Sequence, residues 1–256
     1  MEPSRRHSVW GLHLRSLVTV LLVIAVWEAA ARMQFVPKLF LPSFTAAMRQ
    51  LWLGIVDTTL LRDLSLSLMR AFGGLALALL IGVVLGVAMA RNRIVNWLFD
   101  PLIALGFPSP SIAFLPVFVV WFGIDSLSKV LLVAFACVFP IVIGSYNAAR
   151  GISRVLIWSG YSMGASPFVM LVRVILPACG PRIFAAMRVA LPVALITTFT
   201  AEMVAGGGGM GATLMYSQRF FESPTVFAYI VVMLAVGLLL DSVLLQIQKR
   251  VPAARG

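Results

Sequence analysis

Long apolar runs, separated by short segments that carry the charges, dominate the sequence. A helix needs about 20 apolar residues to cross the hydrocarbon core of a bilayer. Residues 71–90, 101–122 and 130–149 form such runs without any charged residue. Residues 17–31, 189–205 and 226–245 form three more, each with one acid near an end: Glu28, Glu202 and Asp241. The pattern therefore predicts six membrane-spanning helices.

The continuity of these runs predicts helices, because barrel strands would alternate apolar and polar residues at every second position. We expect an all-α polytopic membrane protein. We read the first run as an uncleaved helix, with a cleaved signal peptide as the alternative. The expected organisation is a cytoplasmic N-terminus (1–15), a first transmembrane helix (16–31), an external segment (32–70) with a short amphipathic helix at 44–52, a five-helix core (71–246) that contains a cytoplasmic loop (150–186), and a cytoplasmic C-terminus (247–256).

The composition agrees with this class. Hydrophobic residues make up 61% of the chain, charged residues 11%, and the mean hydropathy is +1.02. A soluble domain carries about a quarter charged residues. The net charge of +11 does not indicate nucleic-acid binding, because Lys and Arg occur singly or in pairs between apolar runs.

The distribution of Lys and Arg among the loops predicts the orientation. With the N-terminus inside, thirteen of the 20 basic residues fall on the cytoplasmic side and seven outside, five of the seven between Arg32 and Arg70. Arg70 and Lys129 are counted here as external loop charges. The positive-inside rule then places both termini in the cytoplasm.

The residue types and their spacing do not indicate a catalytic site. The two cysteines and two histidines have no metal-ligand spacing, so we expect no metal and no catalytic residue. The chain also lacks a Gly-Lys-Ser/Thr phosphate loop, so no cofactor is expected in it, and energy from ATP would have to come from another subunit. Gly206 to Gly209 follow no strand and are interpreted as a flexible turn or gate.

Residues 150–188 form a connection too long for a turn and too patterned for a linker. Residues 153–161 have helical apolar spacing, and Gly164-Ala165-Ser166-Pro167 interrupts it. A second amphipathic stretch covers residues 168–176, and Pro177 and Pro181 follow. These features predict two short helices joined by a tight break.

Gly164-Ala165-Ser166, then Leu176-Pro177, resemble the cytoplasmic "EAA" loop of binding-protein-dependent ABC importer permeases, which lies between the fourth and fifth of six spans. Other stretches are similar to the branch for nitrate, sulfonates and taurine. They are 41–43, 67–70, 100–101, 108–110, 115–116, 121–124 and 139–140, so the resemblance covers nearly everything from Leu41 onward. The chain departs from the family at Trp158-Ser159-Gly160, where Glu-Ala-Ala is common.

The resemblance implies the type I ABC importer permease fold, with a cytoplasmic coupling helix that docks on an ATPase. Its apolar face would enter a groove of that subunit. The alternative from the residues alone is a helix resting on lipid head groups through Arg154 and Arg173. The expected coupling residues are Val155, Leu156, Trp158, Ser159, Gly160, Gly164, Ala165, Ser166 and Pro177.

A translocation path is expected where prolines interrupt the third span, because broken helices line cavities that satisfy their freed backbone groups. Intramembrane Ser and Thr can equally serve helix–helix hydrogen bonding, and Glu202 can equally be structural. The candidate path residues are Pro108, Pro110, Pro140, Ser145, Tyr146, Thr197, Thr198, Thr200 and Glu202.

The resemblance further implies a homodimer, two cytoplasmic ATPase subunits that bind ATP and Mg²⁺, and an extracytoplasmic binding protein that delivers a small solute for alternating access in a bacterial inner membrane. Three other classes of protein are alternatives. An ion-coupled transporter would carry central membrane charges, which the four middle spans lack. A membrane-embedded enzyme would carry a cluster of acids or a nucleophile, which is not seen. A non-catalytic assembly subunit stays open, as does the transported substrate.

Overall fold

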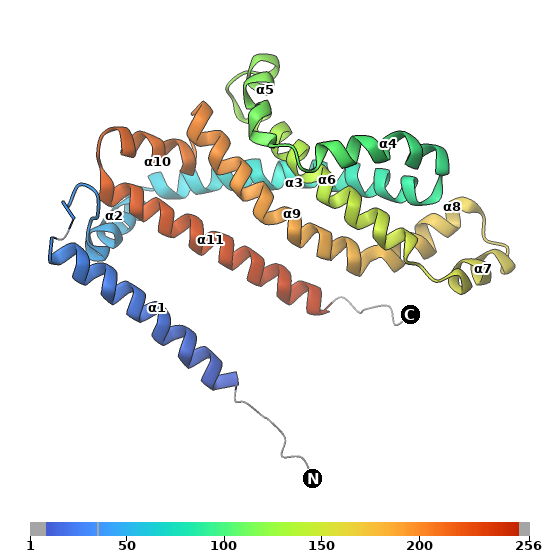
Figure 1. The fold of residues 1–256 in the computed structure, drawn as a ribbon, viewed down its shortest axis with the longest axis horizontal. Helices are drawn as coiled ribbons and strands as arrows, with labels where there is room; N and C mark the ends of the chain where they lie inside the picture. Colours follow the sequence, from blue (N-terminus) through green and yellow to red (C-terminus); the bar gives the residue numbers. More distant parts are fainter. Residues whose placement is uncertain (1–8, 35, 251–256) are drawn as a thin grey trace, which may run out of the picture. The chain divides into compact units, whose positions relative to one another are not determined.

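The computed structural model describes residues 9–34 and 36–250, and all regular secondary structure in this part of the chain is helical (Figure 1). The side chains of residues 9–17, 249 and 250 and the outer parts of the two predicted cytoplasmic tails, 1–8 and 251–256, lie outside the described residues. The elements are α1 (Val9–Arg32), α2 (Phe44–Val56), α3 (Thr59–Arg91), α4 (Arg93–Gly106), the 3₁₀ helix η1 (Ser111–Phe114), α5 (Leu115–Phe122), α6 (Ser126–Arg150), α7 (Arg154–Ser162), α8 (Pro167–Val169), the π-helix η2 (Met170–Ile175), α9 (Leu176–Ala205), α10 (Met210–Arg219) and α11 (Ser223–Arg250).

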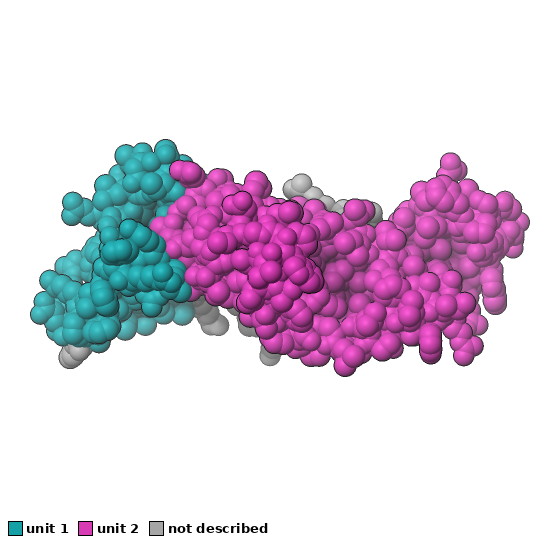
Figure 2. Space-filling view, turned by 90° about the horizontal axis from the view of Figure 1, so that it is seen from above, with its two compact units in different colours: residues 1–61, 214–232 teal, residues 62–213, 233–256 magenta. Residues whose placement is uncertain are grey.

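The chain folds into two compact units, which Figure 2 distinguishes by colour. The smaller unit comprises residues 1–61 and 214–232. The Trp27 ring packs on Phe44 and Phe227 at 5.3 and 5.4 Å between ring centroids, and its Nε1 donates to the carbonyl of Pro42 at 2.9 Å. Glu28 accepts hydrogen bonds from Thr45 and from Arg32. These contacts hold α1, α2 and the start of α11 together.

The larger unit comprises residues 62–213 and 233–256 and has α3, α6 and α9 at its centre. Its core consists mainly of small and β-branched residues, which let the helix backbones approach closely. Glycines of α3 face α6 at positions where a Cβ at Gly74 would lie 2.5 Å from Val133, and one at Gly86 would lie 2.6 Å from the Val142 carbonyl. The Gly82/Gly86 pair is therefore filled by a helix of the same chain.

Four helical stretches in the described part of the chain are long and apolar enough to cross a membrane: α3, α6, the continuous stretch Pro167–Ala205, and Ser223–Gln248 of α11. A fifth is possible as a broken span, because α4 and η1–α5 are bent by 96° around a short break. The prediction that prolines interrupt residues 101–122 is confirmed. Pro108 and Pro110 lie in the break, whereas Pro116 lies in the first turn of α5, which tolerates proline.

Two helices begin well before the residues predicted from hydropathy. The helix expected from residue 71 begins at Thr59, and the helix expected from residue 189 begins at Leu176. Hydropathy misses both extensions, because Arg62 and Arg70 lie in the first and Arg182 and Arg188 lie in the second. Ser67 and Arg70 are nevertheless buried by the bundle. Residues 17–31, which were expected to form the first span, lie within α1.

Candidate functional site

The 150–186 segment is helical almost throughout and projects an apolar face. Ser153 caps α7 by accepting from the Leu156 N–H. Behind the cap, Val155, Leu156 and Trp158 are exposed by 69%, 44% and 63%. Side chains of this size gain about 1.5–3 kcal/mol on burial, so an exposed group of three is a candidate contact surface.

A Schellman motif ends α7 and explains the glycine at position 164. Gly164 has φ +80°, its N–H donates to the Tyr161 carbonyl, and the Ala165 N–H donates to the Gly160 carbonyl. A residue with a Cβ would be strained there. Ser166 then caps the next helix by accepting from the Val169 N–H.

Gly160 occupies the last position of the Trp158-Ser159-Gly160 departure and has a local structural role. It is buried, and a Cβ there would lie 2.4 Å from the Met170 sulfur. Met170 belongs to the π-helix η2, which lies directly before Pro177, a residue with no N–H for the helix ladder. The glycine thus lets α7 pack closely on η2.

The nine predicted coupling residues are placed as follows. Val155, Leu156, Trp158 and Ser159 are exposed on α7, and Pro177 is exposed at the start of α9. Gly160, Gly164, Ala165 and Ser166 line a shallow groove together with Met163 and Arg173. The structure therefore brings four of the nine into one groove, beside the exposed face of α7.

The candidate path residues do not converge in this conformation. Pro108 and Pro110 are exposed, and Pro140, Tyr146 and Thr200 are half-buried. Ser145, Thr197, Thr198 and Glu202 are buried, and Thr198 donates to the Ala194 carbonyl of its own helix. The Ser145 hydroxyl is buried without a hydrogen-bond partner among the described residues.

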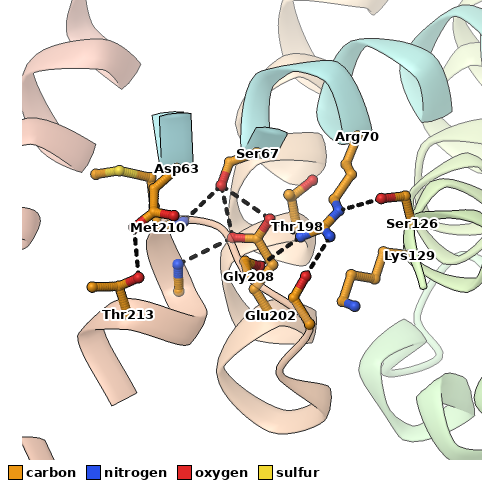
Figure 3. Close-up of polar contacts among 12 residues, drawn as sticks. Asp63, Ser67, Arg70, Ser126, Lys129, Thr198, Glu202, Gly208, Met210 and Thr213 are labelled. Atoms are coloured by element: carbon orange, nitrogen blue, oxygen red, sulfur yellow. Dashed lines mark hydrogen bonds and ion pairs between the residues drawn. The ribbon is translucent and has the colours of Figure 1, made fainter. Parts of the chain in front are cut away.

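Glu202 instead lies at the centre of a buried polar group (Figure 3). Its carboxylate accepts from Arg70 at 2.7 Å, from the Ser67 hydroxyl at 2.8 Å and from the Gly211 N–H at 3.0 Å. Arg70 and Glu202 are 1% and 0% exposed. We call Ser67, Arg70, Ser126, Lys129 and Glu202 the Glu202 cluster. It joins α3, α6 and α9.

Arg70 also holds the chain that follows α9. Its guanidinium donates to the carbonyls of Gly207 and Gly208 at 2.8 and 2.7 Å, and its Nε donates to Ser126 at 3.0 Å. Residues 206–209 form a glycine strap in which every φ is positive, between +69° and +98°. A strap of this conformation requires glycines.

Sequence reasoning placed Arg70 and Lys129 in external loops, and this was wrong, because both are buried within the bundle. A buried arginine is tolerated when its charge is paired and its donors are satisfied. Arg70 and Glu202 are 132 positions apart, so no local pattern connects them. The sequence did offer one indication of the pair: Arg70 and Glu202 each lie at the edge of an apolar run, and their charges are opposite.

A second ion pair connects α9 to the last helix. Arg188 donates from Nε and Nη2 to the two carboxylate oxygens of Asp241 at 2.8 and 3.1 Å. Both side chains are partly exposed, at 36% and 42%. The paired geometry keeps the acid of α11 from facing the bilayer without a counter-charge.

Comparisons with known proteins agree with this architecture. Residues 78–252 match the family described as "Binding-protein-dependent transport system inner membrane component". The "Taurine transport system permease protein TauC" of Escherichia coli (strain K12) is 32% identical over 94% of this chain and 90% of its own length. The Bacillus subtilis (strain 168) protein SsuC, provisionally named as an aliphatic sulfonates transport permease, is 28% identical over 94% of this chain and 86% of its own.

A solved structure shares the fold. A chain of the MetNI methionine ABC transporter in inward-facing conformation superposes with a TM-score of 0.67 at 20% identity, covering 76% of this chain and 96% of that one. At this identity the likeness supports the fold alone.

Proposed function

The chain belongs to the family of binding-protein-dependent transport system inner membrane components, and we propose that two copies of it form the membrane pore of an importer for small sulfonates. As a family member it is an ABC transport subunit, and ATP is bound and hydrolysed by a separate ATPase. In this proposal each copy contributes six spans, namely α1, α3, the broken α4–α5 pair, α6, α8–α9 and α11, with both termini cytoplasmic.

The exposed face of α7 supports the proposal that this helix couples the chain to the ATPase. Val155, Leu156 and Trp158 are held outward by a rigid cap, a Schellman turn and a packed π-helix. A short helix held this way can pass rigid-body motion of a partner into α6 and α9, which flank it in the chain. We place the nine residues Val155, Leu156, Trp158, Ser159, Gly160, Gly164, Ala165, Ser166 and Pro177 at the ATPase contact.

The test is co-purification of the ATPase with the wild-type chain and with Trp158→Glu and Trp158→Phe. The charged variant should lose the ATPase, and the aromatic variant should retain it, because docking in a groove needs a large apolar side chain. Binding of the ATPase to the charged variant at wild-type strength would reject docking through α7. Binding of α7 to lipid head groups would then be the better explanation.

The substrate proposal rests on the relatives. Taurine and aliphatic sulfonates are named for two similar proteins. A sulfonate is an anion with three acceptor oxygens, and the binding protein would set the primary selectivity. Calorimetric titration of that binding protein with taurine, ethanesulfonate and sulfate tests the class. Tight binding of a solute that carries no sulfonate group, with no binding of taurine or ethanesulfonate, would contradict it.

The path proposal retains the nine residues Pro108, Pro110, Pro140, Ser145, Tyr146, Thr197, Thr198, Thr200 and Glu202. The partnerless Ser145 hydroxyl and the break at Pro108 and Pro110 support it. Glu202 and Thr198 already have partners in this conformation, so they would act by holding α9 in place. Tyr146→Ala should reduce uptake without loss of assembly, and unchanged uptake would remove Tyr146 from the path.

A further inference from the structure

Lys129 is a buried cation with little compensation. Its side chain is completely buried, and its ammonium donates to the Ile124 carbonyl at 2.5 Å. An ammonium has three protons to donate. None of the ion pairs formed within the described residues includes Lys129. A buried charge in this state needs a further acceptor or a counter-ion.

The surrounding charges leave an excess of one positive charge in the interior. Arg70, Glu202 and Asp125 are the charged groups that act on Lys129. Glu202 is bonded directly to Arg70 and completes its hydrogen bonds with Ser67 and Gly211. Asp125 is exposed, so water screens its charge. Within the buried part, two cations therefore face one acid.

The glycine strap covers these cations. A Cβ at Gly207 would lie 2.9 Å from the Lys129 ammonium and 3.1 Å from the Ile124 carbonyl, so the strap passes directly over the amine. The carbonyls of Gly207 and Gly208 occupy two donors of Arg70. Three carbonyl oxygens, of residues 124, 207 and 208, thus stand where the oxygens of an anion could accept the same donors.

The strap can be displaced without unfolding its flanks. Helix α10 is anchored separately, because the Met210 N–H donates to Ser67 and the Gly211 N–H donates to Glu202. Helix α9 ends at Ala205, before the strap begins. Lifting the strap breaks the two Arg70–carbonyl bonds, while the Arg70–Glu202 pair can stay in place.

From this arrangement we propose that Arg70 and Lys129 form an anion site that the glycine strap closes, and that displacement of the strap opens it to the sulfonate group of the solute. This rests on the proposed function and deepens it. The excess positive charge, held in a low-dielectric interior, attracts anions and disfavours cations. Arg70 is oriented by Glu202, and Lys129 supplies the uncompensated charge.

A test that does not depend on the substrate uses a thiol placed beside the cations. Ser126 accepts from Arg70 and is partly exposed. In the full transporter with its ATPase, Ser126→Cys is introduced after both native cysteines are replaced by alanine. The rates of modification by the anionic reagent MTSES and the cationic reagent MTSET are compared during ATP turnover.

Lys129→Met should lower the MTSES-to-MTSET rate ratio at least tenfold, and Lys129→Arg should retain most of it. Arg62→Met, which removes an exposed cation of α3, should leave the ratio unchanged. A ratio that does not respond to Lys129→Met overturns the proposal. A thiol that neither reagent reaches during turnover also overturns it, because the strap then does not open.

Uptake of labelled taurine by the same complexes in proteoliposomes provides the second readout. Lys129→Met should reduce uptake at least tenfold and Lys129→Arg less than threefold, with the ATPase still bound in both. Equal losses in both variants would indicate a purely structural lysine and overturn the site. Loss of the ATPase from the wild-type chain would instead reject the proposed function, and absence of taurine uptake with an intact thiol result would reject only the substrate.

Discussion

The Glu202 cluster and the exposed face of α7 show two opposite ways of using unusual residues in a membrane protein. The cluster hides charged groups and satisfies most of them within the chain, while α7 exposes Val155, Leu156 and Trp158. Charges in the interior are costly, so they persist where they hold helices together or meet a ligand. Apolar side chains outside the core persist where another molecule covers them. Substitutions in the Glu202 cluster should therefore change the stability of the chain, whereas substitutions on the exposed face of α7 should change its association with a partner.

The largest effect is expected from Glu202→Gln. The substitution leaves Arg70 buried without a counter-charge, which typically costs about 3–5 kcal/mol. The apparent melting temperature of the detergent-solubilised chain should fall strongly. The double variant Arg70→Met/Glu202→Leu should be more stable than Glu202→Gln, because Arg70 is then no longer left as a second buried cation beside Lys129. Additive losses in the double variant would show that the pair has no such coupling.

Trp158→Glu should affect the second region alone. Its side chain is 63% exposed, so the melting temperature should stay close to that of the wild type. Binding of the ATPase should weaken by roughly 30-fold, about 2 kcal/mol, as for a central apolar residue of an interface. The dissociation constant measured with the chain in nanodiscs gives the result. A Trp158→Glu variant that is destabilised but still binds the ATPase would show that α7 serves stability and not association.

Gly207→Ala should have a smaller effect, confined to the strap. Its φ of +79° disfavours a side chain by about 1–2 kcal/mol, and the new methyl group would also meet the Lys129 ammonium. Gly164→Ala is the matched control, because its φ is +80° but no atom lies near its Cβ position. The melting temperature should fall more for Gly207→Ala. Equal shifts would mean that the strap does not press on Lys129.

Gly160→Ala should have the smallest effect, below about 1 kcal/mol. Its Cβ would meet the end of the Met170 side chain, which is flexible and can move aside. Gly74→Ala is the contrast, because there the Val130 carbonyl lies 2.7 Å from the Cβ position and cannot yield. Thermal melting of both variants measures the difference. A larger loss at Gly160 would show that α7 is held more rigidly than its exposure indicates.

Much of the fold follows from local patterns in the sequence. Apolar runs predicted the long helices, Pro108 and Pro110 predicted the broken span, and the spacing of residues 153–161 predicted α7 with its stop at Gly164. These features depend on residues close together in the chain.

The Glu202 cluster could not be predicted in this way. Counting charges in loops treats Arg70 and Lys129 as loop residues. The reason is that a predicted membrane span, found from the mean hydropathy of a window, is ended where a charged residue occurs. Their burial depends on Glu202 and on the glycine strap, more than seventy positions further along the chain. Pairings over such distances come from the packing of α3, α6 and α9 and leave no periodic signal.

Labelled taurine uptake into proteoliposomes decides whether the chain works as the membrane subunit of an ATP-driven importer. The vesicles contain the chain with its ATPase, the binding protein is added outside, and ATP is enclosed inside. We expect uptake that requires ATP, the ATPase and the binding protein together, and that Trp158→Glu strongly reduces. Uptake by the chain alone, driven by an ion gradient and unaffected by removal of ATP, would contradict it.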